Sequence, residues 1–296
     1  MYVLLASVFT IGKRALMHTA PFFLTAVRLV PAGLIFMSLS FVLHRKNITF
    51  RAKAVPLFAG VAFFYFLMDA FRFVGLTQIP ASHAALLSAL TPFVTALLSN
   101  LVFKESFTLK KLGALCLGFV GVLPLIIQNI LATRVSNNGA SSMQLAGGYA
   151  AMFVCVLSVV IGTFFFKRLV TQEKYPVIWC LGTALFFGGV ASGLVSLFFE
   201  SWNPFPVTNV SVVAPLILFL FITHNLISQP LYGYLVKKYP VTLVSFATLV
   251  TPLTTAVLGF FLYDQPIGYT FLFSVITLAV AFALFYHEEK REGLIH

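Results

Sequence analysis

Apolar runs separated by short polar or proline-containing stretches extend along almost the whole chain. Each run approaches the length of about 20 residues that a helix needs to cross a bilayer. The pattern predicts ten membrane-spanning helices, at residues 2–20, 22–43, 55–78, 80–102, 108–128, 144–166, 176–199, 211–235, 241–262 and 267–286. We therefore expect an all-α integral membrane protein whose longest connection separates five spans from five.

The composition excludes most other classes of protein. Of the 296 residues, 60% are hydrophobic and 9% are charged, whereas soluble domains carry about 25% charged residues. A soluble globular enzyme and a disordered chain are therefore excluded. Cys116, Cys155 and Cys180 lie inside apolar runs without the close spacing of a metal site, so we expect neither a disulfide framework nor a bound metal.

The net charge of +11 comes mainly from alternate loops. If the N-terminus is cytoplasmic, the outer loops contain only Arg134, and the cytoplasmic loops contain fourteen basic residues: Arg45, Lys46, Arg51, Lys53, Lys104, Lys110, Lys111, Lys167, Arg168, Lys174, Lys237, Lys238, Lys290 and Arg291. Cytoplasmic loops of membrane proteins are enriched in Lys and Arg. We therefore expect a multi-pass protein of the cell membrane, specifically a bacterial inner membrane, with both termini cytoplasmic and no nucleic-acid partner.

An internal repeat relates two segments at a constant offset of 160 residues. Residues 79–105 read IPASHAALLSALTPFVTALLSNLVFKE, and residues 239–265 read YPVTLVSFATLVTPLTTAVLGFFLYDQ. The Thr-Pro pairs at 91–92 and 251–252 fall in register without a gap. Because five is an odd number of spans, two such units in series must have opposite orientations, which is a common architecture of secondary transporters.

These features resemble the EamA-type members of the drug/metabolite transporter superfamily. The resemblance lies in Pro21 followed by AVRLVPAGLIF at 26–36, in FVGLTQIPASHAALLSALTPFVTALLS at 73–99, in the FKE turn at 103–105, and in Gly113, Gly118 and Gly121. It covers nearly the whole chain and is stronger in the first half. The second half departs from it, with Gln265 where the first has Glu105 and a tenth span that lacks the three glycines.

The resemblance implies two EamA-like five-helix repeats, at 1–130 and 144–287, joined by a loop at 131–143 and followed by a cytoplasmic tail at 288–296. It also implies ten helices around a central cavity that is lined by the first, third, fourth, sixth, eighth and ninth spans. The activity that it implies is the movement of small organic solutes by alternating access. It does not identify one solute.

Charged side chains inside the spans are the first candidates for a binding site, because each costs about 2.5–3.5 kcal/mol at a helix centre. They are Lys13, Arg14, Arg28, Asp69 and Arg72, all in the outer half of the first repeat and joined there by His83. One acid among four bases leaves an excess of three positive charges. Lys13, Arg14 and Arg28 either extend to the outer interface or face the cavity.

Asp69 and Arg72 are three residues apart on one helix face, with Tyr65 one turn before Asp69. One interpretation is a structural salt bridge that holds the third span to the first or second. In the other, Arg72 with Arg28 or Arg14 binds a substrate carboxylate or phosphate, for which forked guanidinium donors are suited. Asp69 then faces a substrate amine or carries a coupling proton, although a neighbouring arginine favours its ionised form.

The eighth span carries a second polar group of residues. His224, Asn225, Gln229 and Tyr232 are its candidate site residues, and a helical spacing of four and three places the last three on one face. They either line the cavity or make interhelical hydrogen bonds. A hydroxyl stripe at Ser88, Thr91, Thr95 and Ser99, repeated at Thr248, Thr251 and Thr255, is expected to pack helices closely, with gating around Pro92 and Pro252 as the alternative.

No motif for catalysis or for phosphate binding occurs in the sequence, so we expect neither an enzyme nor a cofactor. The predicted substrate-binding residues are Arg72, Asp69, Arg28, Arg14, Tyr65, His83, His224, Asn225, Gln229 and Tyr232. We expect a secondary transporter of a small zwitterion with a carboxylate, such as an amino acid or an S-adenosylmethionine-like compound. Its other partners would be membrane lipids and a coupling proton. The alternatives are a channel or scramblase-like facilitator and an intramembrane enzyme that uses His83 or His224.

Overall fold

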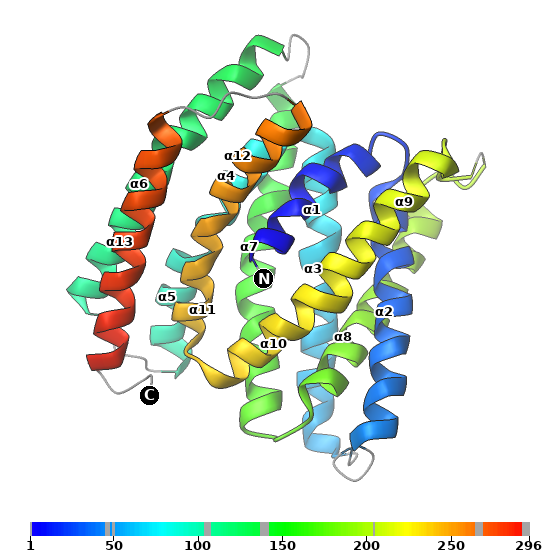
Figure 1. Ribbon diagram of the computed structural model, residues 1–296. Helices are drawn as coiled ribbons and strands as arrows, with labels where there is room; N and C mark the ends of the chain where they lie inside the picture. The colour runs from blue at the N-terminus through cyan, green and yellow to red at the C-terminus, as the bar shows by residue number, and fades with distance from the viewer. Residues whose placement is uncertain are drawn as a thin grey trace.

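The computed structural model describes residues 2–44, 48, 51–103, 108–136, 142–203, 205–263 and 269–291. Nearly all of these residues are helical and the helices run roughly side by side (Figure 1). The elements are α1 (Tyr2–Ala15), α2 (Pro21–His44), η2 (Ala52–Ala54), α3 (Val55–Gln78), α4 (Ala81–Ser88), α5 (Thr91–Phe103), α6 (Leu109–Ser136), α7 (Ser142–Thr171), α8 (Val177–Phe199), α9 (Val210–Leu220), η3 (Phe221–Ser228), α10 (Gln229–Lys238), α11 (Val241–Phe246), η4 (Ala247–Leu249), α12 (Val250–Tyr263) and α13 (Tyr269–Arg291). Within the described ranges no β-strand forms, and Thr19 and Val207 make an isolated bridge.

The all-α membrane fold expected from the apolar runs is confirmed. Seven segments of the described chain are long and apolar enough to cross a membrane. They are Pro21–Leu43, Ala52–Gln78, Met143–Thr171, Val177–Phe199, Val210–Lys238, Val241–Leu258 and Tyr269–Glu288. The other spans predicted from the sequence correspond to α1, to α4 with α5, and to α6.

Several helix ends differ from the predicted boundaries. α1 ends at Ala15 and not at residue 20, because the chain turns there and Ala20 N donates to Pro206 O at 3.2 Å. In contrast, α6 continues to Ser136, inside the stretch expected as a connection, and α7 continues to Thr171. An apolar run marks the part of a helix that faces lipid, but backbone hydrogen bonds can continue beyond it where the residues are polar.

Two segments that were predicted as continuous helices are broken at equivalent positions. α4 ends at Ser88 and α5 begins at Thr91, while α11 and α12 are separated by the short helix η4. Pro92 and Pro252 follow these breaks. A proline has no N–H and its ring clashes with the carbonyl four residues earlier, which interrupts a regular helix at that turn.

The segment that contains His224 is a π-helix, η3, and not a regular α-helix. Ser228 Oγ donates to the carbonyl oxygen of Thr223, five residues earlier, at 2.6 Å. Pro230 follows directly and cannot donate a backbone hydrogen bond. A π-helix has more residues per turn than an α-helix, so side chains five apart share a face here. This shift of register was not visible in the sequence.

The most extensive helix contacts are those of α2 with α8 and of α3 with α7. Gly33 of α2 allows the first contact, because a Cβ at this position would lie 2.4 Å from the backbone N of Phe186. At Gly189 of α8 a Cβ would lie 2.8 Å from the backbone N of Val30. Small residues that let backbones approach closely are a typical basis of helix packing in membranes.

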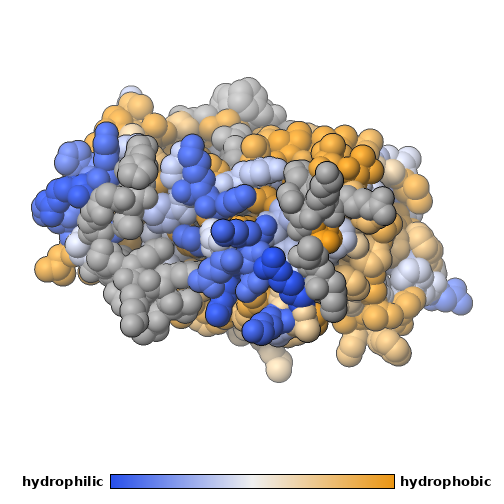
Figure 2. Space-filling model, turned by 90° about the horizontal axis from the view of Figure 1, so that it is seen from below, coloured by the Kyte–Doolittle hydropathy of each residue, from blue (hydrophilic) through white to orange (hydrophobic). Residues whose placement is uncertain are grey.

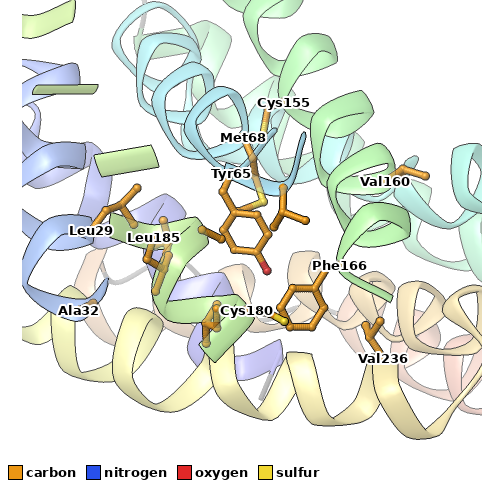
Figure 3. Close-up of a cluster of buried hydrophobic side chains, with 14 of the residues drawn as sticks. Leu29, Ala32, Tyr65, Met68, Cys155, Val160, Phe166, Cys180, Leu185 and Val236 are labelled. Carbon is orange, nitrogen blue, oxygen red and sulfur yellow. The ribbon is translucent and has the colours of Figure 1, made fainter. Parts of the chain in front are cut away.

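The main hydrophobic core lies between α2, α3, α7 and α8. Figure 3 shows part of it, with Tyr65 and Met68 of α3 between Leu29 on one side and Phe166 on the other. The rings of Tyr65 and Phe166 are 6.4 Å apart between centroids. This packing fixes the face of α3 that carries Tyr65, Met68 and Asp69, and it therefore positions the candidate site.

Many of the basic residues of the described chain lie at one end of the helices. This end contains the start of α3, the end of α7, the end of α10 and the end of α13 (Figure 1). Seen from below, hydrophilic side chains cluster in the middle of this face and hydrophobic ones surround much of them (Figure 2). This end thus contains several of the basic residues that the sequence assigns to cytoplasmic loops. Of the residues so assigned, Arg45, Lys46 and Lys104 lie outside the described residues.

Candidate functional site

A cavity with both polar and apolar walls lies between the helices beside the core. Its walls come from α1, α3, the α4–α5 segment, α7, the η3–α10 segment and the α11–α12 segment. These six segments correspond to the six spans that the family resemblance implies as the lining of a central cavity. The empty space between its walls is about 860 Å³ when its open mouth is included. Its lining residues are Leu5, Phe9, Tyr65, Met68, Arg72, Ser88, Thr91, Cys155, Val156, Ser158, Val159, Thr163, His224, Gln229, Tyr232, Ser245, Thr248 and Thr251.

Arg72 presents the positive charge of this cavity, and Asp69 holds it there. Arg72 Nη1 donates to Asp69 Oδ1 at 2.7 Å, one turn along α3. The Asp69 side chain is fully buried, whereas 11% of the Arg72 side chain is exposed and lines the cavity. The helical spacing thus predicted the pair correctly, but only its arginine reaches the cavity wall.

The π-helix adds His224 to this pair. His224 Nε2 lies 3.7 Å from Asp69 Oδ1 and 3.3 Å from Gln229 Nε2. Both His224 and Gln229 line the cavity, five residues apart. The expectation that Asn225, Gln229 and Tyr232 share one face is therefore wrong for Asn225. The wider π-turn brings His224 to the cavity and turns Asn225 away from it.

Asn225 instead contacts Arg28, behind the cavity wall. Arg28 Nη1 donates to Asn225 Oδ1 at 3.2 Å, and both side chains are fully buried. The Arg28 guanidinium also lies 4.7 Å from the ring centroid of Phe73, a cation–π geometry. Arg28 therefore neither extends to the outer interface nor lines this cavity. It joins α2, α3 and η3 behind it.

Two tyrosines form an aromatic part of the cavity wall. Tyr65 lines it from α3 and Tyr232 from α10. The Tyr232 hydroxyl is 2.8 Å from Thr163 Oγ1, which fixes the position of the ring. Phe9 of α1 completes this apolar and aromatic part. The lining therefore combines a charged group with ring faces.

The structure places Arg14, His83 and Lys13 away from this cavity. Arg14 is exposed at the end of α1, and His83 Nδ1 is 2.6 Å from the hydroxyl of Tyr149, over which its ring stacks. Lys13 Nζ donates to the carbonyl oxygens of Leu76 and Ile79, at the C-terminal end of α3. A cation at this end of a helix is stabilising, so Lys13 joins α1 to α3.

Hydroxyl and thiol groups in the lining were not selected from the sequence as site residues. Ser88, Thr91, Thr248 and Thr251 all line the cavity, so the expectation that they serve only packing is wrong. The packing interpretation does fit Thr95, which is buried and donates to the carbonyl of Thr91 within its own helix. The repeat itself contained the signal, because Ser88 and Thr91 match Thr248 and Thr251 at the offset of 160.

The charged cluster, defined here as Arg28, Asp69, Arg72, His224 and Asn225, retains unpaired donors and acceptors. Within the described part of the chain, no hydrogen-bond partner is present for Arg28 Nε and Nη2, Asp69 Oδ2, His224 Nδ1 or Asn225 Nδ2. Buried polar groups in proteins are nearly always paired. With histidine neutral, two arginines and one aspartate leave a formal charge of +1. The cluster can therefore attract an anionic group to the cavity.

Comparisons with known proteins agree with this architecture. An S-adenosylmethionine/S-adenosylhomocysteine transporter of Chlamydia muridarum is 29% identical, over 98% of this chain and 90% of its own length. The transporter with the same name in Chlamydia trachomatis serovar L2 is 28% identical over 98% of this chain and 88% of its own. A WAT1-related chloroplastic protein of Arabidopsis thaliana is 26% identical over 86% of this chain and 60% of its own.

One solved crystal structure has the same fold, with a TM-score of 0.75 and 16% sequence identity over 96% of this chain and 94% of that one. The sequence profile of the EamA-like transporter family matches residues 1–127 and 146–287. These matches confirm transport, and not catalysis, as the class of activity. The chain is a member of the EamA-like transporter family, as its sequence motifs and its helical architecture both indicate.

Proposed function

We propose that this chain is a secondary transporter that works by alternating access and carries a zwitterion of the S-adenosylmethionine type. The observation that carries the proposal is Arg72, which faces the cavity while the buried Asp69 holds its guanidinium. Forked guanidinium donors match the two oxygens of a carboxylate. The two Chlamydia relatives, aligned over 98% of this chain and named for S-adenosylmethionine and S-adenosylhomocysteine, support this substrate.

The lining offers partners for several parts of such a molecule. The carboxylate would pair with Arg72, with Gln229 and His224 beside it. A sulfonium cation is attracted to the faces of aromatic rings, which Tyr65, Tyr232 and Phe9 would supply. The hydroxyls of the α4–α5 and α11–α12 segments would hydrogen-bond to the ribose or the adenine.

The same proposal extends to ten spans in two inverted five-helix repeats. α1, the α4–α5 segment and α6 would complete the ten, in addition to the seven segments that are long and apolar enough alone. The separate matches of the family profile to 1–127 and 146–287 support repeats near 1–130 and 144–287. So do the breaks next to Pro92 and Pro252, because a cavity flanked by equivalent broken helices is typical of inverted-repeat transporters.

The proposed orientation places the basic end of the helices in the cytoplasm. Arg51, Lys53, Lys237 and Lys238 are exposed at this end, as the bias of cytoplasmic loops towards Lys and Arg requires. Both chain ends would then be cytoplasmic in a cell membrane. The short turns near Pro80 and Asp264, of which Asp264 lies outside the described residues, would face the exterior.

The ion pair between Asp69 and Arg72 favours a transporter that exchanges solutes over one that accumulates them with protons. Asp69 contacts Arg72 at 2.7 Å and His224 at 3.7 Å through one oxygen. A carboxylate paired with a cation binds a proton less readily than an isolated one. Asp69 is fully buried and does not line the cavity, so we assign it to holding Arg72, and neither to binding a substrate amine nor to carrying a coupling proton.

Counter-flow in liposomes tests the proposal. The purified protein is reconstituted into vesicles loaded with S-adenosylhomocysteine, and entry of labelled S-adenosylmethionine is followed over time. We expect saturable entry that depends on the internal solute and is lost in the Arg72→Ala variant. Saturable exchange of an amino acid, without exchange of the sulfonium compound, would support a carrier mechanism but show that the proposed substrate is wrong. Linear, unselective flux would instead indicate a channel.

A further inference from the structure

A second, apolar groove lies outside the transport cavity, between the first halves of α3 and α8. α3 contributes Val55, Phe58, Ala59 and Ala62, and α8 contributes Trp179, Thr183 and Phe187, with Tyr175 just before it. The groove encloses about 1210 Å³, including its open side. It shares no lining residue with the transport cavity.

The shape of the groove follows from the way the two helices converge. At Gly188 a Cβ would lie 3.2 Å from the carbonyl oxygen of Ala62, so α3 and α8 are in close contact there. Towards the basic end the groove is lined by Phe58 and Tyr175, whose ring centroids are 5.0 Å apart, and then by Arg51. The groove therefore extends from the close contact between α3 and α8 to the exposed Arg51.

The walls of the groove face the surroundings of the protein. Val55 is 44% exposed and Phe187 is 55% exposed, and both helices belong to the segments apolar enough to cross a membrane. The apolar part therefore lies beside lipid tails. Residues 177–187 of α8 span about 15 Å along the helix, which is about half the thickness of the hydrocarbon core of a bilayer.

Basic side chains surround the open end. Arg51 lines the groove and is exposed, and Lys53 and Lys174 are exposed close by in sequence to its lining residues. Glu173 is the acid of this group, 3.6 Å from Arg51 Nη1. Such an exposed pair is weak, so an anion can displace Glu173 from Arg51. Three cations and one acid leave this end with a formal charge of +2.

We infer that this groove is a binding site for an anionic phospholipid. One acyl chain would lie along α3 and α8, and the phosphate would pair with Arg51 and Lys53. Basic pockets between membrane helices on the cytoplasmic side bind anionic head groups. Trp179 is at the depth where tryptophan prefers the boundary between head groups and tails. A zwitterionic lipid such as phosphatidylcholine would fill the apolar part equally well and also has a phosphate. Its choline cation cancels that charge, however, so the positive charge at this end favours the anionic lipid.

Trp179 provides a direct test, because the chain contains two tryptophans and the second, Trp202, lies beyond the far end of α8. In a Trp202→Phe variant in nonionic detergent, Trp179 fluorescence is titrated with phosphatidylglycerol that carries brominated acyl chains, which quench tryptophan on contact. Phosphatidylcholine with the same chains is the reference. We expect saturable quenching, with a half-saturating concentration at least about fivefold lower for phosphatidylglycerol.

Two pairs of substitutions then locate the head group. In the Trp202→Phe background, the further substitutions Arg51→Gln and Lys53→Gln should abolish the preference for phosphatidylglycerol. Lys237 and Lys238 are a matched pair of exposed cations outside the groove, so Lys237→Gln with Lys238→Gln should leave the preference unchanged. An Ala59→Leu substitution, which narrows the groove, should weaken quenching by both lipids. Equal quenching by the two lipids would show unselective contact with surrounding lipid. That result, or a preference unaffected by Arg51→Gln and Lys53→Gln, would overturn the inference.

Discussion

Arg72 Nη1 lies 2.7 Å from Asp69 Oδ1, and this contact joins a fully buried acid to a base that reaches the cavity. The two residues are one helical turn apart, so the geometry is fixed by α3 alone. Removing one member of a buried pair leaves the other charge without a partner, which costs about 3–5 kcal/mol in a dry site. If Arg72 binds the substrate as we propose, the pair couples stability to transport.

We expect Asp69→Asn to lower thermal stability and exchange activity together. Arg72 and Arg28 would lose the nearest negative charge, so we predict a melting temperature lower by about 5 °C or more. The double variant Asp69→Asn with Arg72→Gln should recover much of the stability, because it removes the unpaired charge, but not the activity. Normal stability and exchange combined with loss of proton-driven uptake would instead assign Asp69 to proton coupling.

Arg72→Ala should weaken substrate binding by about 10- to 100-fold, the loss expected for a hydrogen bond to a charged group. Arg72→Lys keeps the charge but loses the fork, so it should recover part of the affinity. The measurement is the concentration dependence of counter-flow in liposomes. Arg168→Ala is the matched control, because Arg168 is exposed and donates to Gln172 just after the end of its own helix. Equal effects of Arg72→Ala and Arg168→Ala on substrate affinity would show that Arg72 does not bind the substrate.

The apolar runs predicted most of the fold because span length and hydrophobicity are local properties of the sequence. α3 was predicted at 55–78 and forms at Val55–Gln78. The end of α1 was wrong because the bridge from Thr19 to Val207 joins residues that are far apart in the sequence. The breaks before Pro92 and Pro252 could have been predicted from the missing proline N–H.

The candidate site was predicted only in part, because only those of its contacts that lie within one regular helix can be derived from local sequence. Asp69 and Arg72 were paired correctly because their spacing of three lies within one regular helix. Asn225 was placed wrongly because the π-turn changes the register of η3, and nothing local to the chain marks that turn clearly except Pro230. The contact between Arg28 and Asn225 depends on tertiary packing across 197 positions, which spacing rules do not reach.

Close packing of α2 on α8 makes a separate prediction about stability. Gly33→Ala would place a Cβ 2.4 Å from the backbone of Phe186, and backbone cannot move aside without shifting the helix. We expect a clear loss of melting temperature in detergent. Gly113→Ala is the control, because no atom lies within 4 Å of the added Cβ there, and a helical alanine is favoured over glycine. An unchanged melting temperature for Gly33→Ala would contradict the close contact.

The proposed orientation can be tested by cysteine accessibility in intact cells. In a variant without native cysteines, Thr77→Cys at the end of α3 should react with a membrane-impermeant reagent from outside. Lys237→Cys at the end of α10 should react only after the membrane is opened. Both side chains are exposed in the structure, so burial does not confuse the result. Labelling of Lys237→Cys from outside would reject the inverted repeat.

The native Cys155 provides a reporter inside the cavity itself. Cys155 and Arg72 both line the cavity, whereas Cys180 is buried outside its lining and Cys116 is exposed on α6. In a Cys116→Ser, Cys180→Ser background, a small thiol reagent should therefore modify Cys155 slowly. S-adenosylhomocysteine should slow the reaction further, because a bound substrate would cover the thiol. The measurement is the modification rate by mass spectrometry, with and without the substrate.

The outcome of this experiment distinguishes binding in the cavity from binding elsewhere. The matched variant adds Arg72→Ala, which leaves the thiol in place but removes the proposed carboxylate partner. We expect protection to require about 10- to 100-fold more S-adenosylhomocysteine in that variant, in parallel with its loss of affinity in counter-flow. Protection that is equal with and without Arg72 would mean that the substrate covers Cys155 without using this arginine. No protection at concentrations that saturate counter-flow would place the binding site outside the cavity.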